Sequence, residues 1–147
     1  MKLFIGLDVS LATTAVCVLS EHGKIIREAE VASEPEALAQ FVKGQPGEIA
    51  AIGLEAGPLS QWLHRGLAAV GLEVVLMETR QVKGALKAMP IKTDRRDAEG
   101  IARLLHMGWF RPVHCKSVSA QDLRAVLSAR KAVAQGKIAL EMSLRGL

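Results

Sequence analysis

The fold is decided by the first apolar run of the chain, Leu-Phe-Ile-Gly-Leu-Asp-Val at residues 3–9. A short apolar run of this kind is typical of a buried strand. Asp8 is the single charged residue in the run and comes close to its end. Two β-branched segments follow at 13–20 and 25–31, so the first part of the chain is predicted to form a meander of three strands.

Beyond the meander, helical and strand patterns alternate. Ser33, with Glu36 three residues later, has the spacing of a capping box and predicts a helix that ends near Gly44. The remaining predicted elements are a strand at 49–54 closed by Glu55, a helix at 60–70, a strand at 72–77 closed by Glu78, and a helix that starts near Asp94.

The predicted order β-β-β-α-β-α-β-α is that of a ribonuclease H-like α/β fold, a mixed five-stranded sheet flanked by helices. Strands joined through helices should be parallel, whereas the first three can pair as hairpins. In this fold the first strand is central and the fourth lies beside it. Asp8 and Glu55 are therefore expected on neighbouring strands at the same edge of the sheet.

A further acidic pair lies in the segment Lys-Thr-Asp-Arg-Arg-Asp-Ala-Glu at residues 92–99. Asp94 and Asp97 are three residues apart, and positions i and i+3 share one face of a helix. The simpler interpretation is a helix start, where capping residues and acids in the first turn are favoured. A helix at this point could also bring both aspartates across the strand ends that carry Asp8 and Glu55.

Composition limits the class of protein. Half of the 147 residues are hydrophobic, enough for the core of one domain, and the net charge is +4. The basic excess is local, with nine Lys and Arg against three Asp and Glu at 80–116, and it suits an acidic partner. No segment resembles a membrane span or a signal peptide, and Cys17 and Cys115 lack the spacing of metal ligands. We expect a cytoplasmic protein.

Three blocks resemble the DEDD transposases, insertion-sequence recombinases related to the pilin-gene invertases, with a RuvC-like catalytic domain. The blocks are Gly-Leu-Asp-Val-Ser at 6–10, Gly-Leu-Glu-Ala at 53–56 and Lys-Thr-Asp-Arg-Arg-Asp-Ala at 92–98. The third block is the most specific, because actin-like and sugar-kinase folds open with a motif similar to the first. Leu11 departs from the family pattern, since many members have a lysine there.

The resemblance implies a catalytic site for divalent metal ions that acts on phosphodiesters. Its implied ligands are Asp8, Glu55, Asp94 and Asp97. Carboxylates that converge disfavour one another's ionisation, so they need cations or protons. Hard oxygen ligands favour Mg²⁺ or Mn²⁺, and two such ions about 4 Å apart can activate a nucleophile and stabilise a leaving oxygen.

Basic residues near the third block are candidates for contacts with nucleic-acid phosphates. They are Lys92, Arg95, Arg96 and Arg103. Each of them, taken singly, is also explained as part of a solvated surface.

Residues 117–147 are predicted to begin a long basic helix after a RuvC-like catalytic domain at 1–116. Its apolar residues have too little core beneath them, so a partner helix and a homo-oligomer are expected. The resemblance implies that this helix continues as a coiled coil, followed by a second domain with a catalytic serine. We therefore interpret the chain as the amino-terminal part of a longer transposase, whose DNA choice a noncoding RNA can guide.

The predicted function is metal-dependent phosphoryl transfer on DNA during transposition. One alternative is a stand-alone, structure-specific DNA nuclease, which needs the same carboxylates without a second domain. Another is a non-catalytic module for nucleic-acid binding or dimerisation, such as a fragment of an actin-like ATPase. That last class requires a glycine-rich phosphate loop and a duplicated domain, and the 147 residues contain neither.

Overall fold

The computed structural model describes residues 1–88, 94–114 and 118–146. Within these ranges the side chains of six residues are not described, namely Thr79, Leu86, Asp94, Arg95, Arg96 and Val118. The chain forms two compact units, Met1–Cys115 and Lys116–Leu147. The first unit contains a sheet with helices on both faces, and the second is a long helix.

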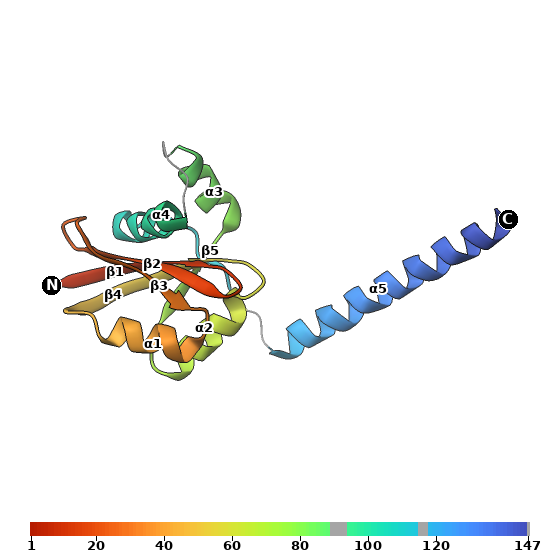
Figure 1. Cartoon of the computed structure of the whole chain (residues 1–147), viewed down its shortest axis with the longest axis horizontal. Coiled ribbons are helices and arrows are strands. Elements are labelled where there is room, and N and C mark those ends of the chain that lie inside the picture. Colours follow the sequence, from red (N-terminus) through yellow and green to blue (C-terminus); the bar gives the residue numbers. More distant parts are fainter. Residues whose placement is uncertain (89–93, 115–117, 147) are drawn as a thin grey trace. The chain divides into compact units, whose positions relative to one another are not determined.

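The sheet of the first unit is mixed and, within the described residues, has five strands in the order β3-β2-β1-β4-β5 (Figure 1). Its strands are β1 (Lys2–Val9), β2 (Thr13–Ser20), β3 (Ile25–Ala32), β4 (Glu48–Glu55) and β5 (Val74–Met77). The first three strands pair antiparallel, whereas β1–β4 and β4–β5 are parallel. This arrangement confirms the predicted fold class, with the first strand central and the fourth beside it.

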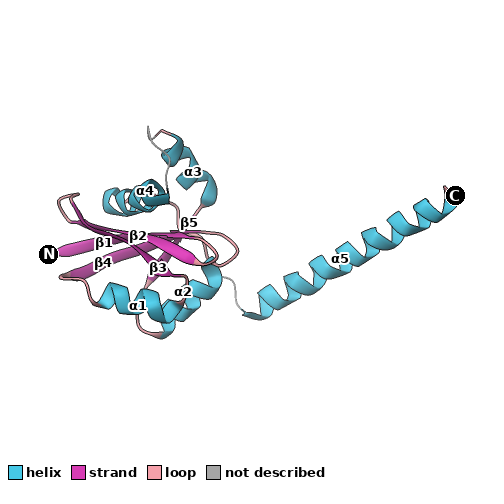
Figure 2. Ribbon diagram, in the orientation of Figure 1, coloured by secondary structure: helices cyan, strands magenta, loops and turns pink. Residues whose placement is uncertain are grey.

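Helices cover both faces of the sheet (Figure 2). On one face lie α1 (Pro35–Lys43) and α2 (Ser60–Ala69), and on the other lie α3 (Thr79–Lys87) and α4 (Asp94–Met107). Between β5 and the long basic helix the sequence predicted one helix, and the described residues there form two. Helix α3 was missed because its segment is short and polar, and Val82 is its one fully buried residue among those described.

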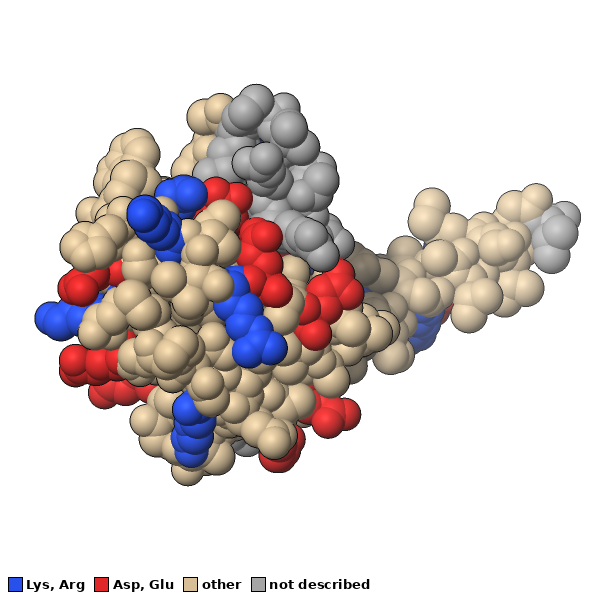
Figure 3. Space-filling model, turned by 60° about the vertical axis from the view of Figure 1, so that its left-hand side comes forward, with Lys and Arg blue, Asp and Glu red and all other residues tan. Residues whose placement is uncertain are grey.

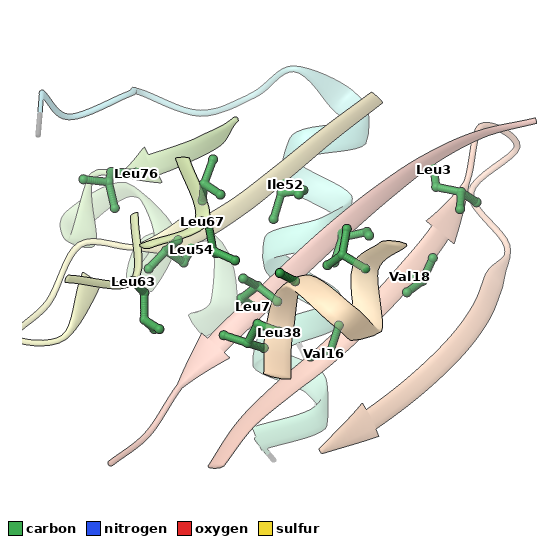
Figure 4. Close-up of a cluster of buried hydrophobic side chains, with 14 residues drawn as sticks. Leu3, Leu7, Val16, Val18, Leu38, Ile52, Leu54, Leu63, Leu67 and Leu76 are labelled. Atoms are coloured by element: carbon green, nitrogen blue, oxygen red, sulfur yellow. The ribbon is translucent and has the colours of Figure 1, made fainter. Parts of the chain in front are cut away.

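The main core lies between the sheet and helices α1 and α2 (Figure 4). Alternate residues of a strand point to opposite faces, so one side chain in two enters this core. From β1 these are Leu3, Ile5 and Leu7, all completely buried. The core residues labelled in Figure 4 from the other elements are Val16, Val18, Leu38, Ile52, Leu54, Leu63, Leu67 and Leu76.

Small residues let α4 approach the opposite face of the sheet closely. A Cβ atom added to Gly6 of β1 would lie 2.5 Å from the backbone nitrogen of Ala102 in α4. A Cβ on Gly53 of β4 would lie 2.9 Å from a methyl carbon of Leu105. Helix α4 therefore packs with its backbone almost against β1, which fixes where its first turn lies.

Ser33 does not cap α1, contrary to the prediction. The N-cap is Glu34, which makes no hydrogen bond from its side chain to the helix. The Ser33 hydroxyl instead donates to the carbonyl oxygen of Ser10 at 2.6 Å and lies 2.8 Å from the Thr14 hydroxyl. Ser33 thus fastens the loop after β1 to the end of β3, and Pro35 starts the helix with its fixed φ.

Cys17 of β2 is buried under α4, and Cys115 lies outside the described residues. Burial is the main cause that raises the pKa of the Cys17 thiol to about 12, and the negative charges of Glu28 and Glu99 act in the same direction. The thiol therefore stays protonated at neutral pH, as expected for a packing residue.

The second unit consists of α5 (Val118–Arg145), a single helix of 28 residues. The large apolar side chains that the structure describes in this helix are exposed, with Leu123 at 60% and Val133 at 74% of their full accessibility. Among the described residues, none of the helices has the length and hydropathy that a membrane span needs.

Candidate active site

Asp8 and Glu55 are neighbours at the carboxyl ends of two parallel strands. Leu7 of β1 pairs with Leu54 of β4, so the next residue on each strand is one of the two acids. The predicted placement of the acids on adjacent strands at one edge of the sheet is what the structure has.

The alternation along each strand decides which face these acids occupy. Leu7 and Leu54 enter the core beneath α1 and α2. Asp8 and Glu55, one residue later, are therefore directed to the opposite face, which α4 covers. Both are half-buried, so their carboxylates lose part of their hydration.

Hydrogen bonds hold the chain that follows Glu55. The backbone N–H of Ala56 donates to the carbonyl oxygen of Met77 at 3.0 Å, which joins the ends of β4 and β5. The buried Ser60 hydroxyl accepts from the backbone N–H of Gly57 at 2.9 Å and donates to the carbonyl oxygen of Gly57 at 2.7 Å. These contacts close a tight turn between β4 and α2, directly after Glu55.

Asp97 reaches the same region from the first turn of α4, where it is half-buried. Burial is the main cause that raises the pKa of the Glu55 carboxyl, and the negative charge of Asp97 acts in the same direction. Ala98, the next residue, packs against Gly6 two positions before Asp8. Asp94 begins α4 and is one helical turn before Asp97, but its side chain lies outside the description.

A cavity of about 520 Å³ opens beside the two strand ends. Asp8, Glu55 and Lys83 of α3 supply its charged lining. The remaining described lining residues are Val9, Ser10, Leu11, Ala56, Gly57, Pro58, Leu59 and Ser60. The cavity is therefore charged at the strand ends and mostly apolar along the β4–α2 turn.

Burial acts on the ionisation of Glu55 more strongly than either nearby charge does. Burial raises the pKa of the Glu55 carboxyl most, the Lys83 ammonium lowers it, and the negative charge of Asp97 raises it. The net direction is upward, so the charge of Lys83 offsets burial and the charge of Asp97 only in part. A cation bound by oxygen ligands would favour the ionised form of Glu55, and the donors present suit Mg²⁺ or Mn²⁺.

The described side chains do not by themselves complete a metal site. Among them, and thus without the Asp94 carboxylate, no group of three or more His, Cys, Asp and Glu residues is placed to hold a metal ion. The arrangement brings acids from β1, β4 and α4 to one edge of the sheet. The ligand set Asp8, Glu55, Asp94 and Asp97 stays a prediction from the sequence.

Of the predicted phosphate contacts, only Arg103 has a described side chain. It forms an ion pair with Glu99 at 2.8 Å and donates to the carbonyl oxygen of Gly23 at 3.3 Å. Gly23 lies in the β2–β3 turn, at the end of the sheet opposite Asp8. Lys92 and the side chains of Arg95 and Arg96 lie outside the described residues.

Basic side chains are scattered on the face drawn in Figure 3. Acidic and uncharged side chains separate the Lys and Arg residues there. This view therefore has no continuous basic surface among the described residues, and a contact with nucleic acid would depend on individual cations.

Lys83 is the site residue that the sequence interpretation missed. Its proximity to Glu55 depends on α3, an element that was not predicted. The signal in the sequence is weak: Val82 and Ala85, directly after β5, have the spacing of one helical face. In the structure the helix begins with a hydrogen bond from the backbone N–H of Val82 to the carbonyl oxygen of Glu78 at 3.1 Å.

Comparison with known proteins identifies the family. A family model for DEDD transposases of the IS110 type, described as "Transposase", matches residues 5–147. The chain belongs to this family. The transposase for insertion sequence element IS1111A of Coxiella burnetii is 29% identical to this DEDD transposase chain over 145 residues. That match covers 97% of the chain but 38% of the relative, so the chain spans well under half the length of that protein.

Solved structures show the same fold. RuvC of Thermus thermophilus is similar to this DEDD transposase chain with a TM-score of 0.52 and 16% identity, over 76% of the chain and 99% of RuvC. T. thermophilus RuvC in complex with a Holliday junction substrate gives a TM-score of 0.50 with 18% identity, over 77% of the chain and 100% of RuvC. The ribonuclease H-like, RuvC-like fold predicted from the sequence is confirmed.

Proposed function

We propose that this chain is the catalytic amino-terminal part of a DNA transposase that transfers phosphoryl groups with a divalent cation. The observation that carries the proposal is the placement of Asp8 and Glu55 on adjacent strand ends, on the face that α4 covers, with Asp97 acting on Glu55. Membership of the DEDD transposase family supports the reaction class.

The proposed metal ligands are Asp8, Glu55, Asp94 and Asp97. Bound Mg²⁺ or Mn²⁺ supplies activation of a nucleophile and stabilisation of the leaving oxygen. The half-buried position of the acids strengthens their attraction for a cation, because water screens the charges less there. The packing of Gly6 against α4 holds Asp97 in place relative to Asp8.

The proposed partner is DNA, bound through its phosphates. Lys92, Arg95 and Arg96 flank the two aspartates in sequence and are the proposed contacts nearest to them. Arg103 is a weaker candidate, because its guanidinium group is already engaged by Glu99 and the β2–β3 turn.

The proposal extends to the organisation of the protein. We propose a catalytic domain at residues 1–116 and the start of an oligomerising helix at 117–147, supported by the exposed apolar side chains of α5. A serine-bearing second domain and a guide RNA are implied by the family resemblance alone. The cytoplasmic location stays a prediction from the sequence.

A binding assay with a branched DNA tests this proposal. The 147-residue chain is titrated against a fluorescent four-way DNA junction, with Mg²⁺ and with a chelator. We expect Mg²⁺ to strengthen binding, and Asp8→Asn and Asp97→Asn to abolish this gain. Glu48→Gln is the matched control, because Glu48 is an exposed acid at the opposite end of β4.

Two results would change the account. Binding that is equal with Mg²⁺ and chelator, and equal in the Asp8→Asn variant, would contradict the metal site. Cleavage of the junction by the 147-residue chain with Mg²⁺ would favour the stand-alone nuclease.

A further inference from the structure

Helix α3 places a positive charge among the acids of the cavity. Val82 is almost completely buried between α3 and the sheet and anchors this helix. Lys83, the next residue, lines the cavity together with Asp8 and Glu55. Of the described residues that line this cavity, Lys83 is the single cation.

Lys83 is close enough to the acids for its charge to act on Glu55. The Lys83 residue is nevertheless exposed, so its flexible side chain can redirect the ammonium ion without moving α3. The other described lining residues supply no second cation. Asp8 and Glu55 are acids, and Leu11 and the β4–α2 turn supply apolar and neutral atoms.

A divalent cation and an ammonium ion compete for the same carboxylates. When a cation is held by the acids, the ammonium ion loses part of its attraction to them and is repelled by the cation. The nearest anion then available in the proposed reaction is a phosphate of the DNA backbone. Lys side chains bind phosphate as compact point charges.

We propose that Lys83 is a phosphate-positioning residue, which neutralises Glu55 while the carboxylates lack a cation and contacts a DNA phosphate once a cation is bound. The inference deepens the proposed function and rests on it. The residue that contacts the backbone phosphate then lies on α3, outside the three sequence blocks that carry the acids.

Lys83→Met should have opposite effects on the binding of Mn²⁺ and of DNA. Removing the competing ammonium ion should tighten Mn²⁺ binding about threefold to tenfold in the absence of DNA. Losing one phosphate contact should weaken DNA binding. It should also make the fall of log affinity with log salt less steep, by about 0.9 in the magnitude of the slope. A merely structural role of Lys83 would weaken both.

The test uses the 147-residue chain, isothermal titration with Mn²⁺ alone, and fluorescence anisotropy with a DNA duplex in Mn²⁺ at several salt concentrations. Lys87→Met is the matched control, because Lys87 is an exposed lysine one turn further along α3 that is not among the described lining residues. Lys83→Arg keeps the charge and should retain the salt slope of the wild type.

The outcomes separate the inference from the function on which it rests. Tighter Mn²⁺ binding with a lower salt slope in Lys83→Met, and neither change in Lys87→Met, supports the assignment. Mn²⁺ binding by the wild type that Lys83→Met leaves unchanged, or an unchanged salt slope, overturns the role of Lys83 alone. A wild type that does not bind Mn²⁺ overturns the metal site and the inference together.

Discussion

At the scale of single residues, Glu55 combines conflicting demands. It is the last residue of β4, directly after the buried Leu54, and it lies near Asp8 of β1 and Asp97 of α4. Partial burial and the charge of Asp97 disfavour its carboxylate, whereas Lys83 favours it. Glu55 therefore lowers the stability of the cation-free protein in its ionised form, which is a common property of residues selected for chemistry.

Glu55→Gln should consequently stabilise the protein at neutral pH. The folded-state pKa of Glu55 is raised, so the wild type loses stability as pH rises from the usual Glu range through this raised pKa. Glutamine does not ionise and escapes this loss. Thermal unfolding without divalent cations should therefore give a higher melting temperature for Glu55→Gln at pH 7 than for the wild type.

The advantage should disappear below about pH 4, where the wild-type carboxyl is protonated in both the folded and unfolded states. Glu48→Gln removes one negative charge from the exposed start of β4 and serves as the control. A stability difference that is the same at all pH values would show that ionisation of Glu55 is not its cause.

Gly6 is a residue whose side chain is excluded by a neighbouring backbone. Its Cβ would lie 2.5 Å from the backbone nitrogen of Ala102, so Gly6→Ala requires α4 to move. Such overpacking costs about 1–3 kcal/mol of unfolding free energy. Denaturant titration should show this loss, together with weaker Mn²⁺ binding, because α4 carries Asp97.

The same substitution in α3 provides the control. A Cβ at Gly84 meets no atom within 4 Å, so Gly84→Ala should raise stability by about 0.5–1 kcal/mol through helix propensity. Equal stability of Gly6→Ala and the wild type would contradict the close packing of α4 on β1.

Residues that end strands could be predicted from the sequence, whereas residues in polar helices could not. Asp8 and Glu55 interrupt apolar runs, and the parallel pairing of β1 and β4 follows from the element order. Lys83 is one of several lysines, and only the position of α3 distinguishes it. Ser33 fitted a capping box, but its hydroxyl bonds to Ser10 and Thr14, which are distant in sequence and therefore not visible in a local pattern.

At the scale of elements, α4 connects the two ends of the sheet. Its first turn carries Asp97 beside the carboxyl ends of β1 and β4, and Arg103 two turns later contacts the β2–β3 turn. Helix α4 thus extends from the acidic edge of the sheet to the β2–β3 turn, which Arg103 contacts. The sequence predicted α4 through its apolar spacing but could not give the contacts of Arg103.

Arg103→Ala should reduce stability without altering DNA binding. It removes the ion pair with Glu99 and the hydrogen bond to Gly23, and because the pair is partly exposed the loss should be about 0.5–1.5 kcal/mol. Denaturant titration measures this loss. A salt slope for DNA binding that falls by about one would instead assign Arg103 to a phosphate, as the sequence predicted.

At the scale of the whole molecule, the two units differ in how their apolar side chains are buried. The first buries its apolar residues in clusters on both faces of the sheet. In the second, Leu123, Val126, Val133 and Leu140 recur at intervals of three and seven residues along α5 and remain exposed. This spacing is typical of a helix that packs against another helix.

Sedimentation equilibrium should therefore show self-association of the 147-residue chain. Val133→Asp places a charge within the apolar stripe and should shift the chain towards the monomer, whereas Gln135→Glu on a polar position should not. A wild type that stays monomeric at the highest concentration studied would contradict a homo-oligomer through α5.

In the proposed active site, acids from β1, β4 and α4 hold a divalent cation. The most direct measurement is anomalous diffraction from a crystal of the chain soaked in Mn²⁺. We expect an anomalous peak within coordination distance of Asp8 and Glu55 and of at least one of Asp94 and Asp97. Ordered aspartates that point away from Asp8, with no peak at the strand ends, would contradict the metal site and leave the acids of α4 as a helix start.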